Sequence, residues 1–443
     1  MSKQNRQKRA AKAKQRAAKQ RQQPSPEQSS AYDFTAPPLP ADLIANMLLS
    51  ASFERAKGDV GAAKECAATL ASPRFQGTTR DIETAAHLAT DHVFIRVFRD
   101  GWLPEDLFQI TRRRLDRVAV SYLVDELAAY MRQFAPTIVH PVWRDQLAQI
   151  EAVTWWSRDK PQLGQWAAKN VLDLAEALAI VIEVLGLLMT LHPVAVIAPL
   201  PGTVKNQKVT AHHGVDEKML SRVRALLAKA ESSSFPEEAE ALSAKAQELM
   251  TRHALDRVLV EADTSAPAMV GTHRIWLDAP YLDAKSLLVE MVSKANRCRA
   301  IFHASWGFMS VLGDENDLES VELLTTSLLL QATKAMLSGG SQTTRGGQSR
   351  TRSYRQSFLV AYATRIGERL ERTNTTTIAE APDSARLLPV LVSRQQKVDA
   401  EFDIRYPATV GKHVSVSNAA GWGAGTAAAD RAQLETRRTV GGS

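Results

Sequence analysis

The chemistry that this sequence offers most plainly is the neutralisation of phosphate by side-chain cations. Nine basic residues and no acidic residue lie in residues 1–22. They are Lys3, Arg6, Lys8, Arg9, Lys12, Lys14, Arg16, Lys19 and Arg21. A segment of this kind binds nucleic acid, either DNA or RNA, through salt-sensitive contacts that do not depend on base sequence. A tail that only keeps the protein soluble is the alternative, and base stacking is excluded because the segment has no aromatic residue.

Further cations lie at two other places in the chain. The loop at residues 344–355 supplies Arg345, Arg350, Arg352 and Arg355. It lacks the lysine of the G-x-x-x-x-G-K-[ST] nucleotide-binding loop, so phosphate binding and a loop without a ligand both remain open. Arg222 shares a stripe with Lys218 and Lys229 and could extend a phosphate contact. The glutamates near this stripe favour a solvated helix face instead.

Residues that could catalyse a reaction are sparse. The ten histidines are scattered, and the H-E-x-x-H and G-x-S-x-G motifs are both absent. Asp314, Glu315 and Asp317 follow an expected strand, where carboxylates can hold a divalent metal. The favoured interpretation is that they stabilise the N-terminal end of a helix, and His253 is expected to cap the last turn of another helix. No catalytic residue, metal site or cofactor is therefore predicted.

The bulk composition indicates folded domains with the positive charge gathered in one segment. A length of 443 residues, of which 44% are hydrophobic and 23% charged, is typical of two or three globular domains. The net charge is +7, so the nine cations of residues 1–22 leave −2 for the rest of the chain. Nucleic-acid binding is therefore expected from local clusters of cations and not from the whole folded surface.

Cysteine use and hydropathy predict a cytoplasmic protein without a membrane segment. Cys66 and Cys298 are too few and too far apart for a disulfide scaffold or a cysteine zinc site. No apolar segment follows the basic N-terminus, as it would in a secretory signal. The apolar stretch at residues 184–200 carries His192 and Pro193, which favours a buried core helix ended by the proline over a membrane span.

The chain divides into four regions that would position these residues. Residues 1–40 are predicted to be a disordered basic tail and linker. Residues 41–200 are predicted to form an all-helical domain, and residues 215–260 a helical hairpin. Residues 270–440 alternate between helix and strand patterns and are predicted to form an α+β C-terminal domain. The predicted fold class is mainly α with a smaller α+β C-terminal domain.

Apolar spacing and turn signals place the individual elements. In the helical domain, helices are expected at residues 41–70 with a break at 58–61, 81–100, 120–134, 140–152 and 162–191. In the C-terminal domain, strands are expected at 272–277, 298–303, 308–312 and 397–404, and helices at 282–296, 314–337, 354–372 and 418–436. Gly421 and Gly425, four residues apart, are expected to let the last helix pack closely on a neighbour.

The hairpin is the most strongly patterned stretch of the sequence. Met219, Val223, Leu226 and Ala230 fall on one face of its first helix, and Ala239, Leu242, Ala246 and Leu249 on one face of its second. Ser234 and Glu237 have the spacing of a capping box at the start of the second helix. Two short helices with facing apolar stripes predict a helical hairpin.

The segment VRALLAKAESSSFPEEAEALSAKAQELMTRHAL, residues 223–255, resembles the family called domain of unknown function 2786, which is common in actinobacteria and their phages. The Gly-Trp-Leu-Pro of residues 101–104, the aromatic segment at 354–359 and the glycine-rich 420–425 resemble the wider architecture of such proteins. Ala254 departs from the pattern, since a glycine often follows the histidine there. The resemblance implies a family but no established chemistry.

Three functions are compatible with these patterns. The favoured hypothesis is a nucleic-acid-associated accessory protein anchored by its basic N-terminal tail. The first alternative is a metal-dependent enzyme that acts on nucleic acid through the carboxylates of residues 314–317. The second alternative is a protein-interaction scaffold. The expected partner is nucleic acid, no membrane partner is expected, and a protein partner remains open.

Overall fold

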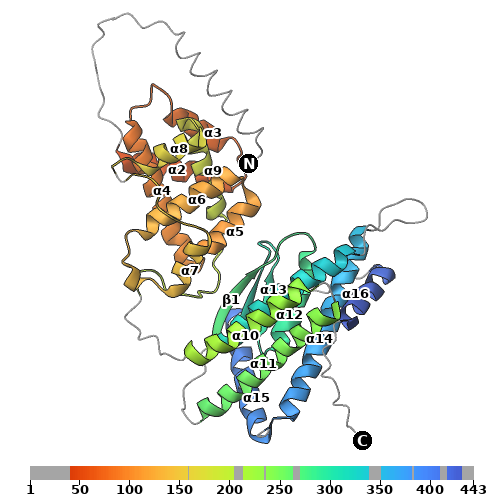
Figure 1. Ribbon diagram of the computed structural model, residues 1–443. Coiled ribbons are helices and arrows are strands. Elements are labelled where there is room, and N and C mark those ends of the chain that lie inside the picture. The colour runs from red at the N-terminus through yellow and green to blue at the C-terminus, as the bar shows by residue number, and fades with distance from the viewer. Residues whose placement is uncertain are drawn as a thin grey trace, which may run out of the picture. The chain divides into compact units, whose positions relative to one another are not determined.

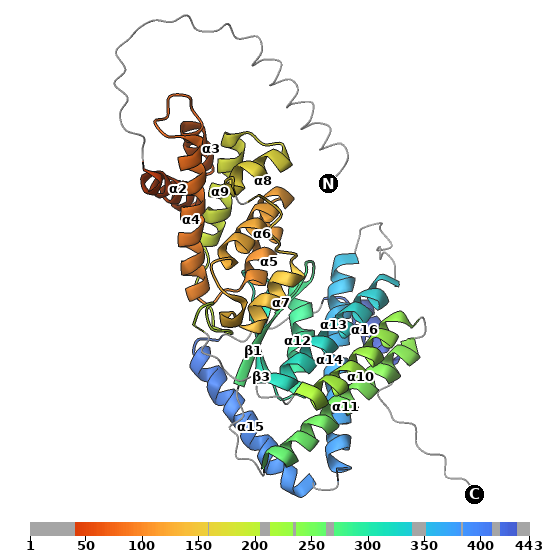
Figure 2. The same cartoon turned by 60° about the vertical axis from the view of Figure 1, so that its left-hand side comes forward.

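The computed structural model describes residues 40–157, 159–203, 213–233, 236–262, 270–338, 351–381, 384–409 and 417–431. The chain forms two compact units, residues 1–208 and residues 209–443 (Figures 1 and 2). Each unit is described by itself. The fold is mainly α with a small antiparallel sheet in the second unit, which confirms the predicted fold class.

The first unit is a bundle of helices. Its elements are α2 (Ala41–Ala56), α3 (Ala62–Leu70), α4 (Thr79–Arg99), α5 (Pro104–Arg114), α6 (Arg117–Met131), η1 (Pro136–Ile138), α7 (Pro141–Gln149), α8 (Gln162–Asn170) and α9 (Leu174–Met189). Helix α9 packs against α2, α3, α4 and α6. Its apolar side chains are buried, as expected of a core helix, and it ends four residues before Pro193. Among the described helices, none is long and apolar enough to cross a membrane.

The single helix expected at residues 162–191 is wrong, because the chain breaks between α8 and α9. Val171 takes the left-handed conformation, with φ 57°, at the end of α8. Asp173 then starts α9 with a capping box, in which its carboxylate accepts from the Glu176 N–H at 2.8 Å. The Glu176 carboxylate accepts from the Asp173 N–H in return. This reciprocal pair starts a helix independently of the apolar pattern that runs through the break.

The Gly-Trp-Leu-Pro segment forms the turn between α4 and α5. Gly101 has φ +93°, and a Cβ there would lie 2.3 Å from the Val194 carbonyl oxygen. Only glycine fits this close approach of two backbone segments. The Trp102 indole N–H donates to the carbonyl of His192 at 2.9 Å, so the segment ties the start of α5 to the chain after α9.

The second unit contains a three-stranded antiparallel sheet covered by helices on both faces. Its strands are β1 (Val270–Trp276), β2 (Arg299–His303) and β3 (Phe308–Asp314), in the order β1-β3-β2. Trp276 lies opposite Phe308 in one pair of strands, and Arg299 opposite Leu312 in the other. Helices α12 (Leu282–Ala295) and α13 (Glu315–Ser338) pack on one face, and α15 (Ser384–Arg405) packs on the other.

The strand expected at residues 397–404 is wrong, because this segment belongs to α15. Its apolar residues alternate in the sequence, which is the pattern of a strand. Val398 and Phe402 are nevertheless four residues apart, and both pack on Leu312 in the sheet. Ile404, which a strand would place on the same side, is 74% exposed. The helical spacing of the two buried residues therefore decides the conformation.

The hairpin consists of α10 (His213–Ser232) and α11 (Pro236–Ala262) and shares its core with α12, α13 and α14 (Thr351–Ala379). Helix α11 continues beyond the expected end of the hairpin, so the prediction that His253 caps a last turn is wrong. Ala254 keeps the helical conformation where a glycine would favour a stop. Leu255 then packs against Leu391 of α15, which accounts for the longer helix. The side chains of Ser234 and Glu237 lie outside the described residues.

Candidate nucleic-acid interface

The predicted close packing of the last helix is confirmed. Helix α16 (Ala419–Arg431) lies alongside α14 (Figure 1). A Cβ at Gly421 would lie 2.3 Å from the Tyr354 carbonyl oxygen, and one at Gly425 would lie 2.2 Å from that of Phe358. Farther along both helices, the Arg369 guanidinium donates to the carbonyl of Ala429. Later residues of α16 therefore contact later residues of α14. The two helices are parallel, and their N-terminal ends lie together.

The paired N-terminal ends are the positive ends of two helix dipoles. The first turns of α14 and α16 contain no acidic residue. Backbone N–H groups at a helix start have no partner within the helix, and the helix dipole adds a partial positive charge there. Asn418 caps α16 by accepting from the Gly421 N–H at 2.9 Å, and its own N–H donates to the Ser357 hydroxyl of α14 at 3.1 Å. This geometry favours an anion.

Arg352 and Arg355 lie in the first two turns of α14 and not in the expected loop, so that part of the prediction is wrong. They add two full charges to this end. Arg352 is exposed and Arg355 is half-buried. The Arg355 Nε is buried and has no hydrogen-bond partner within the described part of the chain. A cation at a helix N-terminus is disfavoured by the dipole, and a buried N–H without a partner costs about 1–3 kcal/mol. A phosphate bound at this end would offset the repulsion between these two cations and the helix dipoles.

Among the other predicted cations, the structure describes Arg222 alone, and it lies on a different helix. Arg222 is exposed on α10, which packs chiefly on α11 and α13. On the same helix, Lys229 lies 3.1 Å from a Glu238 carboxylate oxygen, as expected of a solvated face. Arg345, Arg350 and the nine cations of residues 1–22 lie outside the described residues.

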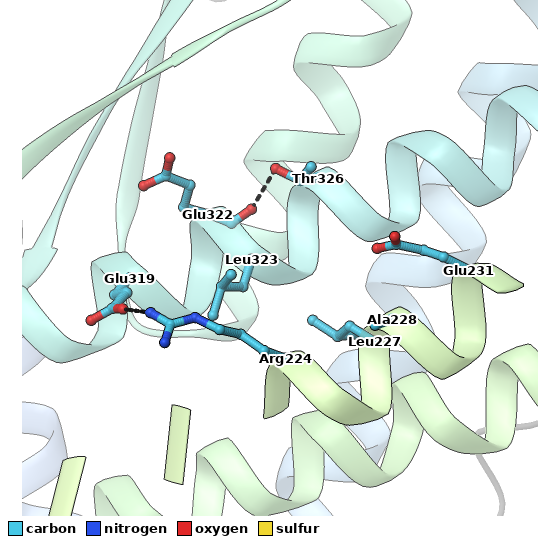
Figure 3. A pocket seen from close by; sticks show the side chains of 8 residues that line it. All are labelled: Arg224, Leu227, Ala228, Glu231, Glu319, Glu322, Leu323 and Thr326. Atoms are coloured by element: carbon cyan, nitrogen blue, oxygen red, sulfur yellow. Dashed lines mark hydrogen bonds and ion pairs between the residues drawn. The ribbon is translucent and has the colours of Figure 1, made fainter. Parts of the chain in front are cut away.

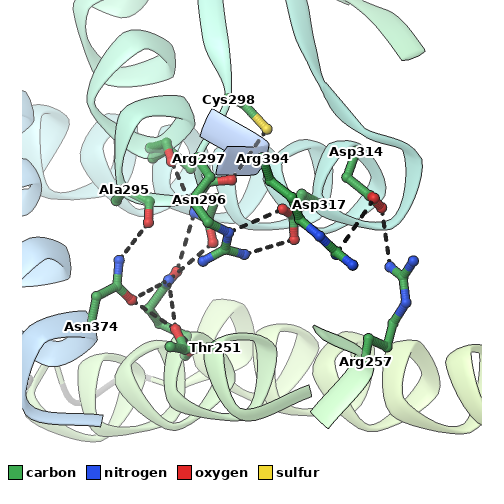
Figure 4. A network of polar contacts seen from close by, with 12 residues as sticks. Thr251, Arg257, Ala295, Asn296, Arg297, Cys298, Asp314, Asp317, Asn374 and Arg394 are labelled. Atoms are coloured by element: carbon green, nitrogen blue, oxygen red, sulfur yellow. Dashed lines mark hydrogen bonds and ion pairs between the residues drawn. The ribbon is translucent and has the colours of Figure 1, made fainter. Parts of the chain in front are cut away.

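Two of the three carboxylates considered for metal binding, Asp314 and Asp317, are bound to arginines (Figure 4). The Arg257 guanidinium donates to Asp314 at 3.1 Å, and Arg394 lies 4.0 Å from the other Asp314 oxygen. Arg297 holds both oxygens of Asp317, at 2.8 and 3.3 Å. Glu315 and Asp317 are in the first turn of α13. The described residues contain no group of three His, Cys, Asp or Glu side chains that could hold a metal ion.

Beside these ion pairs, a network of buried amides joins the hairpin to two other helices (Figure 4). The Gln247 amide donates to Asn296 at 3.0 Å and to Asn374 at 2.9 Å. The Thr251 hydroxyl donates to the same Asn374 oxygen at 2.7 Å. This network was not among the predicted features. The available signal was a polar pair, Gln247 and Thr251, at helical spacing next to the apolar stripe of α11.

A titratable pair in the first unit was also missed. His87 Nδ1 of α4 lies 3.0 Å from the Glu126 carboxylate of α6, and His87 Nε2 lies 3.7 Å from Asp91. The hydrogen bond to Glu126 raises the pKa of His87 to about 9, although burial opposes the shift. Burial raises the pKa of Glu126, and the bond to His87 offsets only part of that rise. The i, i+4 spacing of His87 and Asp91 was the signal available in the sequence.

Burial also explains the state of the two cysteines. Cys298 is fully buried beside Gly313, where a Cβ would lie 2.3 Å from its sulfur. Cys66 is half-buried, and neither cysteine forms a disulfide. Burial raises the pKa of both thiols, which disfavours the thiolate form.

Comparison with known proteins bears on the hairpin. Residues 218–257 match the family described as "Protein of unknown function (DUF2786)". The matched segment ends at Arg257, the residue that binds Asp314. The chain matches no curated protein and no solved structure. The α10–α11 hairpin is thus the part of this chain that matches the DUF2786 family.

Proposed function

We propose that this protein is a nucleic-acid-associated accessory protein that works in the cytoplasm. In this proposal, the cations of residues 1–22 anchor it to the phosphate backbone without regard to sequence. The paired N-terminal ends of α14 and α16, with Arg352 and Arg355, hold one phosphate group in a fixed geometry. The tail supplies most of the affinity, and the helix ends orient the folded unit on the nucleic acid.

One observation carries the proposal for the folded part of the chain. Two parallel helices bring their N-terminal ends together next to two arginines. The first turns of these helices contain no acidic residue. Outside the basic segment the chain has a net charge of −2, so this end of the two helices is a local concentration of positive charge. Placing cations at helix N-termini costs free energy unless an anion binds there. A phosphate supplies the negative charge and the acceptor oxygens that the arrangement lacks.

The metal-dependent enzyme receives no comparable support. Its carboxylates, Asp314 and Asp317, are neutralised by Arg257 and Arg297. Releasing either carboxylate for a metal would leave a half-buried guanidinium without its partner.

The test is binding to a duplex DNA and to a single-stranded RNA over a range of salt concentrations. The full chain is compared with a chain that starts at Ser29. Loss of nine cations is expected to lower the slope of log K against log salt by up to about 8 for duplex DNA. The double variant Arg352→Gln and Arg355→Gln, made in the shorter chain, is expected to lower the remaining slope by about 1, which corresponds to one phosphate contact.

Arg372→Gln is the matched control, since Arg372 is an exposed arginine near the other end of α14. It is expected to leave binding by the shorter chain unchanged. If the shorter chain with Arg352→Gln and Arg355→Gln binds as tightly as the chain with Arg372→Gln, the helix ends do not contact phosphate. If neither the full nor the shorter chain binds nucleic acid, the whole proposal is wrong.

A further inference from the structure

A hollow interrupts the packing of the hairpin against α13 (Figure 3). It has a volume of about 440 Å³ and lies between α10 and α13. At one end, the Arg224 guanidinium donates to Glu319 at 2.6 Å. At the other end, the Lys334 ammonium donates to the carbonyl of Glu231. The helices are therefore held together on both sides of the hollow, which makes it a fixed feature of their packing.

The hollow exists because small side chains lie between these two clamps. Ala228 of α10 and Thr326 of α13 line its walls, and Leu227 and Leu323 supply an apolar floor. The Thr326 hydroxyl donates to the carbonyl of Glu322 at 2.9 Å, so its hydrogen-bonding capacity is used within its own helix (Figure 3). The walls of the hollow therefore present methyl groups, which favour an apolar group of a ligand inside it.

The rim of the hollow is acidic. Glu231, Glu319 and Glu322 line it together with Arg224. The Lys334 ammonium lies at the Glu231 carbonyl, so three acids and two bases leave a formal charge of −1. Glu319 is paired with Arg224, and a Glu322 oxygen lies 3.3 Å from His273 Nδ1. Their side chains are still 38% and 52% exposed, so their outer faces can meet a ligand from solvent. An apolar floor beneath carboxylates suits a lysine or arginine, which buries a methylene stem and leaves its cationic head at the surface.

An apolar stripe continues from the hollow along α13. Leu330 and Leu337 follow Leu323 at intervals of seven residues, so all three lie on one face of the helix. Leu330 is 42% exposed and Leu337 is 52% exposed. The stripe is roughly 20 Å long at 1.5 Å per residue, which is the length of several helical turns. One side chain fills the hollow, but only a longer apolar face covers the stripe.

We propose that the groove between α10 and α13 binds a basic amphipathic helix of a partner protein. The helix places one lysine or arginine side chain in the hollow and apolar side chains on Leu330 and Leu337. This binding site is separate from the helix ends of α14 and α16 and does not depend on the nucleic-acid role. A second copy of the chain is disfavoured as occupant, because symmetric pairing would bring two acidic rims together. Residues 1–22 have the required cations but lack an apolar stripe.

The test measures the binding of labelled synthetic peptides to the full chain by fluorescence anisotropy. The probe is a peptide of about five helical turns with leucines at i, i+3 and i+7 and lysines beside them. A second peptide has every lysine replaced by glutamate, and a third consists of residues 1–22. The first peptide is expected to bind, the second not to bind, and the third to bind at least tenfold more weakly than the first.

Ala228→Leu fills the hollow and is expected to weaken binding of the first peptide at least tenfold. Ala225→Leu is the matched control, because Ala225 is exposed on α10 but does not line the hollow. Glu231→Gln with Glu322→Gln keeps the shape of the hollow and is expected to weaken binding as well. Equal binding by Ala228→Leu and Ala225→Leu would overturn the proposal. So would equal binding of the first and third peptides, or a dimer of the chain that Ala228→Leu dissociates.

Discussion

Substituting alanine for each glycine of α16 gives the sharpest test of how this helix packs. Gly421, Gly423 and Gly425 lie within five residues of one another, yet their surroundings differ. A Cβ at Gly421 or Gly425 would lie 2.3 or 2.2 Å from a carbonyl oxygen of α14, whereas a Cβ at Gly423 meets nothing within 4 Å. The contacted atoms are backbone atoms, so they cannot move aside without shifting the whole helix.

The expected energies follow from two opposing effects. Replacing a helical glycine by alanine adds up to about 1 kcal/mol of stability through helix propensity. Forcing the two helices apart costs about 1–3 kcal/mol, as in other overpacked cores. Gly423→Ala is therefore expected to stabilise the second unit by about 0.5–1 kcal/mol, and Gly421→Ala to destabilise it by about 1–2 kcal/mol. Gly425→Ala is expected to resemble Gly421→Ala.

Thermal unfolding of the full chain, followed by circular dichroism, measures these differences. For a unit of this size, 1 kcal/mol corresponds to a Tm shift of about 2–4 °C. The reasoning is refuted if Gly421→Ala raises the Tm of the second unit as much as Gly423→Ala does. The same variant separates the N-terminal ends of α14 and α16. It is therefore also expected to weaken phosphate binding by the chain that starts at Ser29, whereas Gly423→Ala leaves that binding unchanged.

Three further perturbations test other contacts. The pKa of His87 is raised from 6.5 to about 9 in the folded state. The stabilisation of the first unit by His87 is therefore complete below about pH 6.5 and is lost as the pH rises through about 9. Urea denaturation at several pH values should show this loss, and His87→Gln should abolish it; a flat profile for the original chain would contradict the ion pair with Glu126. Arg297→Ala leaves the half-buried Asp317 without its bidentate partner. It is expected to lower the free energy of unfolding, measured by urea denaturation, by roughly 2–3 kcal/mol. A decrease under about 0.5 kcal/mol would mean that solvent replaces the arginine. Asp173→Ala removes the capping box of α9 and is expected to cost about 1 kcal/mol, while Asp173→Asn should restore most of it.

Most helices and three strands could be predicted because their apolar residues repeat at the period of the element they form. The turn at residues 305–307 between β2 and β3 was equally visible, and the N–H of Gly307 donates to the carbonyl of His303 at 2.8 Å there. The errors lie where two patterns coexist in the sequence. Residues 397–404 alternate like a strand and also place Val398 and Phe402 at helical spacing. Only the position of the sheet against which they pack selects the helix.

The candidate interface was predictable in composition but not in arrangement. Arg352 and Arg355 stood out as cations in a loop-like segment, and Gly421 and Gly425 as a small-residue pair suited to close helix packing. That the glycines bring the start of α16 to the arginines depends on a contact between segments more than 60 residues apart. Pattern reasoning in a single sequence carries no information about such pairings. The same limit hid the bond between His87 and Glu126, which come from different helices.

The hairpin depends on contacts with other parts of the second unit. Arg257, Gln247 and Thr251 all bind residues outside the matched segment, at Asp314, Asn296 and Asn374. The apolar residues Val223, Leu227 and Met250 are buried in a core completed by α12, α13 and α14. The matched segment is therefore shorter than the folded unit that buries its apolar residues. A gene that acquired only these 40 or so codons would inherit a recognisable sequence without the surface that holds it in shape. Its relatives are best sought as whole second units, in which partners of the hairpin change together with it.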